Sequence, residues 1–500
     1  MEEKKTFLQE NLKKIFIIFL ILHVIVWSLL PLIRQILPID AMECVYWGGL
    51  IDLGTNKHPP LAGWIAYIVY NLLGKSDFLI YLLGQVSIIV GFIYLYRLGK
   101  LFLTEIKALL SVMVMEACFV YTYMGIYDGF NPNFLLLAFL PMITFYFYKS
   151  IHYGKVWDWI KLGIFVGLSF LAKYQTLMLF IPLFAYLIVT PSGRKQFKTK
   201  NFYIAVFVAF AIFLPHIIWL YNHKFFSLNY FLICEERYAS FYSGSFKYLW
   251  APIAFLFNQF VAISGVLFIY FTALLFSKEK IGKEDQNADD KKFLIFAGII
   301  PVLLQSLNGL NGNYMIPQWG YSLLFMSGIL LFYFFPFKIS DRVIKYIVSW
   351  VFAAMFITFI VLLIVFATEK NFANRFPVSQ VTNTLYEIYK SETGRDMKYI
   401  GGFIELSIPL SLYNQGKYIA VLNTYKYPNP WINDTDLKES GAIVIGRNRS
   451  YMDEYIDVTA PTLDQKPEVK QFKFTVKSAV NRKREYKMFY AIILPNANYK

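Results

Sequence analysis

The segment DAMECVYWGGLIDLGTNKHPPL, residues 40–61, is the stretch of this 500-residue chain that says most about its fold. It stands between two long apolar runs, yet it gathers carboxylates, a basic pair and a double proline: Asp40, Glu43, Asp52, Lys57, His58, Pro59 and Pro60. An apolar run of about 20 residues is long enough to cross a bilayer. A polar segment between two such runs is therefore predicted to lie at a membrane surface.

The composition agrees with this prediction, because 57% of the residues are hydrophobic and 19% are aromatic. Such values indicate a polytopic α-helical membrane protein. Run length predicts about eleven transmembrane helices: 14–34, 77–97, 104–125, 131–150, 158–173, 176–191, 203–221, 251–277, 293–310, 316–336 and 343–367. We therefore expect a membrane domain over residues 1–367 and a separate domain over residues 368–500.

Residues 368–500 mix one helical pattern, VSQVTNTLYEIYK, with strand-like runs. The runs are YIGGFIEL, YIAVLNT, GAIVIG and MFYAIILP. Alternating helix and strand signals of this size predict a small α/β domain.

The net charge of +15 comes from lysines and arginines in short loops such as PSGRKQFKTK, residues 191–200. Cationic residues in such loops fix membrane topology, so nucleic acid is a poor candidate partner. With the N-terminus in the cytoplasm, most of these residues fall on the cytoplasmic side. Residues 40–61 directly follow the first span and are then predicted outside, and an odd number of spans also places the C-terminal domain outside. The working location is a bacterial inner membrane with a periplasmic site.

The three cysteines, Cys44, Cys118 and Cys234, form no CxxC motif and no metal-ligand spacing. They predict neither a disulfide framework nor a zinc site.

Four further polar stretches are predicted on the same outer face as residues 40–61. They are YDGFNPN (127–133), AKYQT (172–176), NYFLICEERYAS (229–240) and LNGLNGNYMIPQWG (307–320). Several loops that converge on one face predict a single polar site.

Each polar residue also has a purely structural interpretation. Asp40 and Glu43 have the spacing of a helix capping box, and Asp52, Asp128 and the His58-Pro-Pro sequence suit turns. Lys173 can extend to lipid headgroups, and Arg237 can pair with Glu235 or Glu236. Their shared placement on one face favours a common site.

Two polar residues within predicted spans are interpreted differently. Glu116 lies near the middle of the third span, where an ionisable group is costly and usually faces the bundle interior. A structural hydrogen bond between helices is favoured over a proton relay. His216, in the seventh span, is expected to be a packed histidine, and neither residue is placed in the site.

The motif order resembles a known family. An acidic motif after the first span, followed by YW, LG and HPPL, is similar to the lipid-linked-sugar glycosyltransferases of family 39, in the protein O-mannosyltransferase and lipid A aminoarabinose transferase superfamily. Further similar stretches are DGFNPNFLLLAFLP, GLSFLAKYQTLMLF, LPHIIWL, NPWIND and GAIVIG. The resemblance implies a membrane-embedded glycosyltransferase C fold along nearly the whole chain.

The resemblance also implies an activity. One sugar would pass from a polyprenyl-phosphate carrier to an envelope acceptor at the outer face, with inversion at the anomeric carbon. The acceptor can be lipid A, another envelope lipid or glycan, or a protein hydroxyl. No cofactor is required; a divalent cation is possible but not implied, and no metal ligands are assigned.

Site residues follow from the resemblance position by position. Asp40 is the first candidate for the catalytic base, with Glu43 as the alternative, because the family often has adjacent Asp-Glu where this chain has the two carboxylates three residues apart. Asp128 matches the second acidic position. The donor phosphate would contact Lys57, His58, Lys173 and Arg237, and the sugar or acceptor pocket would contain Trp47, Asn131 and Asn133.

Two other classes of protein remain open. A secondary transporter or flippase would place polar or broken helices at the bilayer midplane and show internal symmetry. Apart from Glu116, the polar residues gather at one face, and no repeat is found. A non-catalytic scaffold would not need Asp40, Glu43, His58 and Lys173 on one side.

Overall fold

The computed structural model describes most of the chain. The described residues are 6–124, 128–228, 230, 244, 246–277, 287–371, 374–422, 429, 431–461, 463–480 and 482–497. The chain divides into two compact units. The first unit comprises residues 1–29, 53–62 and 81–361, and the second comprises residues 30–52, 63–80 and 362–500. The predicted boundary after residue 367 stays a prediction, because the second unit draws on three separate parts of the chain.

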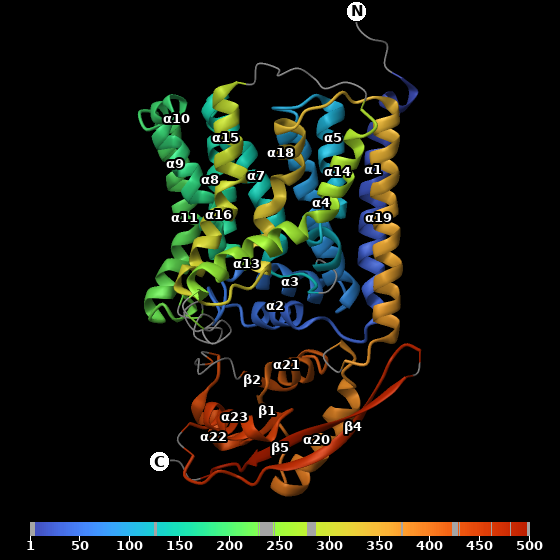
Figure 1. Ribbon diagram of the computed structural model, residues 1–500. Coiled ribbons are helices and arrows are strands. Elements are labelled where there is room, and N and C mark those ends of the chain that lie inside the picture. Colours follow the sequence, from blue (N-terminus) through green and yellow to red (C-terminus); the bar gives the residue numbers. More distant parts are fainter. Residues whose placement is uncertain are drawn as a thin grey trace, which may run out of the picture. The chain divides into compact units, whose positions relative to one another are not determined.

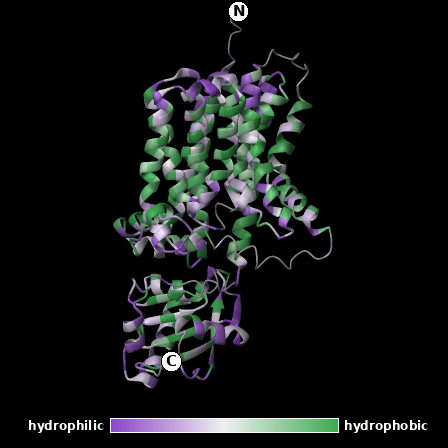
Figure 2. Ribbon diagram, turned by 90° about the vertical axis from the view of Figure 1, so that its left-hand side faces the viewer, coloured by the Kyte–Doolittle hydropathy of each residue, from purple (hydrophilic) through white to green (hydrophobic). Residues whose placement is uncertain are grey.

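The first unit is a bundle of apolar helices (Figure 1). Its helices are α1 (Phe7–Leu29), the later part of α4 (Asp77–Gly99), α5 (Glu105–Met113), α7 (Pro132–Tyr153), α8 (Val156–Ala172), α9 (Leu177–Val189), α10 (Pro191–Gln196), α11 (Lys200–Asn222), α13 (Lys247–Ala262), α14 (Ser264–Leu274), α15 (Ala288–Gly298), α16 (Ile300–Leu307), α17 (Gln318–Tyr321), α18 (Ser327–Phe334) and most of α19 (Asp341–Thr368). Hydrophobic residues cover the long helices, and hydrophilic residues gather near their ends (Figure 2). This pattern is that of an integral membrane protein.

Within the described part of the chain, six helical segments are long and apolar enough to span a membrane. The count rises to seven if the pair α13 and α14, bent by 57°, is one span. The predicted count of about eleven is therefore not confirmed. The predicted spans at 176–191 and 316–336 correspond to shorter apolar helices. The predicted span at 158–173 corresponds to α8, which has 17 residues.

The predicted span at 104–125 is interrupted. α5 ends at Met113, and the chain continues as a 3-10 turn, η2 (Val114–Ala117), and a π turn, η3 (Val120–Met124). At this break the backbone N–H of Phe119 donates to the carbonyl of Ala262 at 2.9 Å. The hydrogen bond to another helix compensates for one that a continuous helix would make internally.

Glu116 lies on η2 and holds this break against α1. Its Oε2 lies 2.7 Å from Nδ1 of His23, and its Oε1 accepts from the indole N–H of Trp27 at 2.8 Å. All three side chains are buried. The prediction of a structural hydrogen bond between helices is confirmed, and His23, Trp27 and Glu116 are called the Glu116 cluster below.

The second unit contains a five-stranded sheet with the order β2-β1-β3-β5-β4. Its strands are β1 (Tyr399–Gly402), β2 (Ile419–Leu422), β3 (Ala442–Gly446), β4 (Lys470–Lys477) and β5 (Lys483–Ile493). The first three are parallel, whereas β5 pairs antiparallel with β3 and β4. The accompanying helices are α20 (Val378–Thr393), α21 (Ile404–Leu412), α22 (Asp434–Ser440) and α23 (Met452–Thr459). A small α/β domain is therefore confirmed.

One strand prediction fails in its second half. The run YIGGFIEL forms β1 only up to Gly402, where φ is +117°, and α21 begins at Ile404. Glycine tolerates this backbone conformation, which lets the chain leave the sheet. The other predicted strands coincide with β2, β3 and β5, and the predicted helix coincides with α20.

The second unit also includes the acidic part of the opening segment. α2 (Ile39–Gly49) joins the sheet through Tyr46, whose hydroxyl bonds both the carbonyl and the N–H of Ala420 at 3.1 Å. Arg375 donates to the carbonyls of Ile33 and Phe366 at 2.8 and 2.7 Å. Arg375 thereby links the backbone just after the first span to the backbone at the end of the last span.

Candidate active site

The loop that connects α2 to α3 (Leu61–Leu72) presents two basic side chains. The hydroxyl of Thr55 accepts from the N–H groups of Lys57 and His58 at 3.2 and 2.8 Å, and donates to the carbonyl of His58 at 2.8 Å. Pro59 and Pro60 then lead directly into α3. The predicted rigid turn is thus present, and its geometry fixes where Lys57 and His58 project.

Lys173 lies at the junction of α8 and α9. Its backbone is extended, with φ −162° and ψ 135°, so α8 ends at Ala172 and a 3-10 turn, η4 (Tyr174–Thr176), follows. The ammonium group donates to the side-chain oxygen of Asn133 at 2.5 Å. An inward hydrogen bond of this kind disfavours the interpretation that Lys173 only extends to lipid headgroups.

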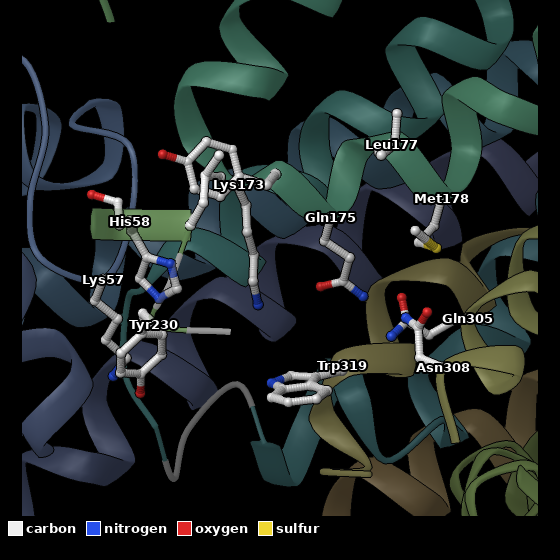
Figure 3. Close-up of a pocket in the computed structure, with 13 residues that line it drawn as sticks. Lys57, His58, Lys173, Gln175, Leu177, Met178, Tyr230, Gln305, Asn308 and Trp319 are labelled. Atoms are coloured by element: carbon white, nitrogen blue, oxygen red, sulfur yellow. The ribbon is translucent and has the colours of Figure 1, made fainter. Parts of the chain in front are cut away.

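Lys57, His58 and Lys173 line one cavity of about 400 Å³, entirely within the first unit. Figure 3 shows the three side chains on the same side of this cavity, with the Lys173 amine directed into it. The ammonium group of Lys57 lies 5.8 Å from the ring centre of Tyr230. These three residues are called the basic cluster.

The basic cluster concentrates positive charge. Burial lowers the pKa of His58 well below its ordinary value of 6.5, and the charges of Lys57 and Lys173 lower it further. Among the described residues that line the cavity there is no Asp or Glu to balance the lysines. A pocket with this electrostatic character suits an anion, and a phosphate in particular.

A second, smaller cavity of about 30 Å³ contains three more predicted site residues. Asp128, Asn131 and Asn133 line it, together with Gln318 and Tyr321. The Asn133 that lines it is also the acceptor for Lys173, so this bond connects the two cavities.

Asn131 has a structural role in the fold. Its side-chain oxygen caps α7 by accepting from the N–H of Asn133 at 2.9 Å. Its own side chain is 2% exposed, which leaves it little access to a ligand. Its predicted place in the sugar pocket stays a prediction.

The predicted base and its neighbours lie on α2 in the second unit. Pro38, not Asp40, is the N-cap residue, and no side chain caps this helix. The capping-box interpretation of Asp40 and Glu43 is therefore wrong. Their spacing of three residues puts both carboxylates on one face of the helix, with Glu43 buried.

The position of α2 on α3 is fixed by close backbone contact. A side chain on Gly48 would meet the carbonyl oxygen of Gly63 at 2.0 Å, so only glycine fits. Trp47, also predicted in the sugar pocket, is 4% exposed.

Arg237 lies outside the described residues, as do Glu235, Glu236 and Cys234. Its predicted phosphate contact stays a prediction. His216 is buried, with Nδ1 2.6 Å from the carbonyl of Leu53 and Nε2 2.7 Å from the Tyr174 hydroxyl. The expectation of a packed histidine is confirmed.

The cavity also contains residues that the sequence did not single out: Gln175, Tyr230, Gln305, Asn308 and Trp319. All but Gln305 fall within stretches noted as unusually polar, AKYQT, NYFLICEERYAS and LNGLNGNYMIPQWG. The sequence therefore pointed to these four residues only through the polarity of the stretches that contain them. In the described part of the chain, no three His, Cys, Asp or Glu residues converge as a metal site would require.

The membrane helices, the basic cavity and the small α/β unit define a class before any relative is considered: an integral membrane protein with a cavity lined by two lysines and a histidine. The comparisons show which known proteins the chain is similar to. Residues 57–219 match the family model described as dolichyl-phosphate-mannose-protein mannosyltransferase. ArnT from Cupriavidus metallidurans, solved with undecaprenyl phosphate bound, aligns with a TM-score of 0.61 and 12% identity, over 95% of this chain and 97% of that one. The chain therefore has the glycosyltransferase C fold of ArnT and is similar in sequence to glycosyltransferases.

Two curated relatives from Rhizobium johnstonii are galacturonosyltransferases. The lipopolysaccharide core galacturonosyltransferase RgtA is 21% identical over 42% of this chain and 41% of its own length. The lipid A galacturonosyltransferase RgtD is 25% identical over 37% of this chain and 38% of its own length. The chain therefore matches about two fifths of the length of these relatives.

Proposed function

We propose that this chain is an inverting glycosyltransferase that moves one sugar from a polyprenyl-phosphate carrier to an envelope acceptor. The basic cavity is the observation that carries the proposal, because it offers a polyprenyl phosphate two ammonium groups and an imidazole. The undecaprenyl phosphate bound to ArnT supports the carrier, and the names of RgtA and RgtD support a lipid A or lipopolysaccharide acceptor.

The basic cluster suits the departing group. As the bond between the anomeric carbon and the phosphate oxygen breaks, negative charge grows on the phosphate. Lys57 and Lys173 stabilise this charge through charge-assisted contacts. The carrier leaves as a stable phosphate anion, so no acid needs to protonate it. Arg237 is proposed as a further cation.

The acceptor hydroxyl needs a base. In this proposal a carboxylate of α2, Asp40 or Glu43, takes the acceptor proton while the acceptor oxygen bonds to the anomeric carbon from the opposite face. Asp128 orients the acceptor or the sugar. The sugar thereby inverts, and free polyprenyl phosphate is released.

The site is proposed to face the periplasm of a bacterial inner membrane, with the N-terminus cytoplasmic. The concentration of lysine and arginine in loops such as residues 191–200 supports this orientation. Accessibility labelling of single cysteines tests it: residue 128 should react from outside and residue 196 from inside.

Turnover of the purified chain in nanodiscs tests the proposal. The protein is given a panel of polyprenyl-phosphate sugars with envelope extract, and mass spectrometry follows free polyprenyl phosphate. We expect release from at least one donor, lowered at least about 100-fold in Asp40→Asn while carrier binding persists. Full activity in that variant would move the base to Glu43 or remove the mechanism. No release from any donor would refute the proposed function.

A further inference from the structure

The main cavity has two chemically different halves (Figure 3). The basic cluster occupies one side. The other side presents the amide side chains of Gln175, Gln305 and Asn308, and the indole of Trp319 lies below the gap between the two halves. The amide residues come from η4, α16 and η5 (Asn308–Asn311), so distant parts of the chain converge here.

Gln175 carries the strongest indication of a ligand. Both the oxygen and the nitrogen of its side-chain amide are buried and have no hydrogen-bond partner among the described residues. Buried polar atoms in folded proteins are nearly always paired, and an exception calls for an explanation such as a ligand or water. Figure 3 shows this amide between the Lys173 amine and the side chains of Gln305 and Asn308.

A buried amide without a partner is not sufficient by itself. Gln85, on α4, has the same property but lines neither of the two cavities described above. What distinguishes Gln175 is its place in a cavity that is also lined by two other amides and by the partly buried indole of Trp319. Gln85 therefore provides a matched control.

The amide half suits a sugar ring. Each amide offers a donor and an acceptor, which matches the hydroxyl groups of a sugar, and an indole face packs against the apolar face of a sugar ring. In a lipid-linked donor the sugar is bonded directly to the phosphate. A sugar subsite must therefore adjoin the phosphate subsite, as the amide half adjoins the basic cluster.

We infer that Gln175, Gln305, Asn308 and Trp319 form the subsite for the donor sugar and that this sugar is uncharged. The inference rests on the proposed function and deepens it. No Asp, Glu, Lys or Arg is among the described residues of this half. A uronic acid would require a cation beyond those that bind the phosphate, and an amino sugar would require a carboxylate, because an unpaired buried charge is costly.

Binding to the full-length protein in nanodiscs tests this inference. The ligands are polyprenyl phosphate alone and the same carrier bearing a neutral hexose, a hexuronic acid or an amino-pentose. We expect the neutral hexose to bind tightest. Gln175→Ala should weaken the binding of the hexose-bearing carrier on the order of tenfold, and it should change the affinity for bare polyprenyl phosphate by less than about twofold. Gln85→Ala should change neither.

The outcomes separate the two proposals. If bare polyprenyl phosphate does not bind the wild-type protein, the proposed function fails and the subsite fails with it. If it binds, but Gln175→Ala weakens bare and hexose-bearing carriers equally, the subsite alone is refuted. Tighter binding of the hexuronic or amino-pentose carrier refutes the uncharged sugar. Asn308→Ala repeats the test should Gln175→Ala not fold.

Discussion

The Glu116 cluster and the basic cluster both place titratable side chains inside the helical unit, fully buried in the first and partly buried in the second, but they differ in how their charges are matched. In the Glu116 cluster, both carboxylate oxygens accept hydrogen bonds or face a ring nitrogen on α1. In the basic cluster, two lysines and a histidine of like character share a cavity whose described lining contains no carboxylate. In the first arrangement the carboxylate is matched by donors within the fold, whereas the second is proposed to bind an anion.

This difference separates stability from binding. Breaking a matched buried pair leaves its partner unpaired, which is strongly destabilising. Removing a charge from a cluster of like charges relieves repulsion and should cost little stability. Substitutions in the Glu116 cluster should therefore lower the unfolding temperature. Substitutions in the basic cluster should instead weaken the binding of the ligand.

The largest effect is expected for Glu116→Leu. The substitution leaves the imidazole of His23 and the indole N–H of Trp27 without their buried acceptor, which should lower the free energy of unfolding by about 3 kcal/mol. Thermal unfolding in detergent, followed by size-exclusion chromatography, measures the loss.

Glu105→Leu is the control, because Glu105 lies on the same stretch of chain but makes a partly exposed pair with Lys13 at 2.9 Å. A Glu116 variant as stable as the control would show that the cluster does not hold α1 to the break after α5.

The second-largest effect is expected for Lys173→Ala, in the binding of the carrier. Loss of one charge-assisted contact should weaken the binding of polyprenyl phosphate by about 10- to 100-fold, while the unfolding temperature stays close to that of the wild type. The control is Lys161→Ala, at an exposed position of the preceding helix α8, which should bind polyprenyl phosphate normally. Unchanged affinity in Lys173→Ala would remove this residue from the phosphate site.

The sequence predicted the basic cluster better than the rest of the cavity. Lys57, His58 and Lys173 are ionisable residue types, so their occurrence between apolar runs was itself a signal. Gln175 lies only two residues from Lys173 but is uncharged, and Gln305 lies within a largely apolar helix. That these amides line one cavity depends on how η4 and α16 are placed in the bundle, which no local pattern encodes.

The fold shows the same limit. Apolar runs located the helices, but run length did not reveal where they break. The sequence LLSVMVMEACFVYTYMG is apolar apart from Ser111, Glu116 and Thr122, and it contains no proline or glycine before Gly125 that would mark the end of α5 at Met113. The break is fixed by tertiary contacts, Glu116 with α1 and Phe119 with Ala262.

A smaller effect, dependent on pH, is expected from His58. Because the pKa of His58 is lowered in the fold, the unfolded chain binds more protons below pH 6.5, and stability falls as the pH falls through this range. The loss from this residue is at most about 1.4 kcal/mol for each pH unit. Unfolding temperatures of the wild type and His58→Gln from pH 7.5 to 5.5 measure it.

The His58→Gln variant should lose less stability over this range than the wild type does. Saturating polyprenyl phosphate should also reduce the loss in the wild type, because an anion between Lys57 and Lys173 offsets the charges that oppose protonation. A pH dependence identical in the variant and the wild type would contradict the assignment.

The smallest effect is expected where charges are matched but not buried. Lys466 and Asp457, in the second unit, form an ion pair at 2.8 Å with side chains 45% and 57% exposed. Water already solvates both groups, so Lys466→Ala should change the free energy of unfolding by less than about 1 kcal/mol. Thermal unfolding in low and high salt checks this. A loss as large as that of Glu116→Leu would show that matching alone, without burial, stabilises this protein, and the contrast between the two buried clusters would then lose its physical basis.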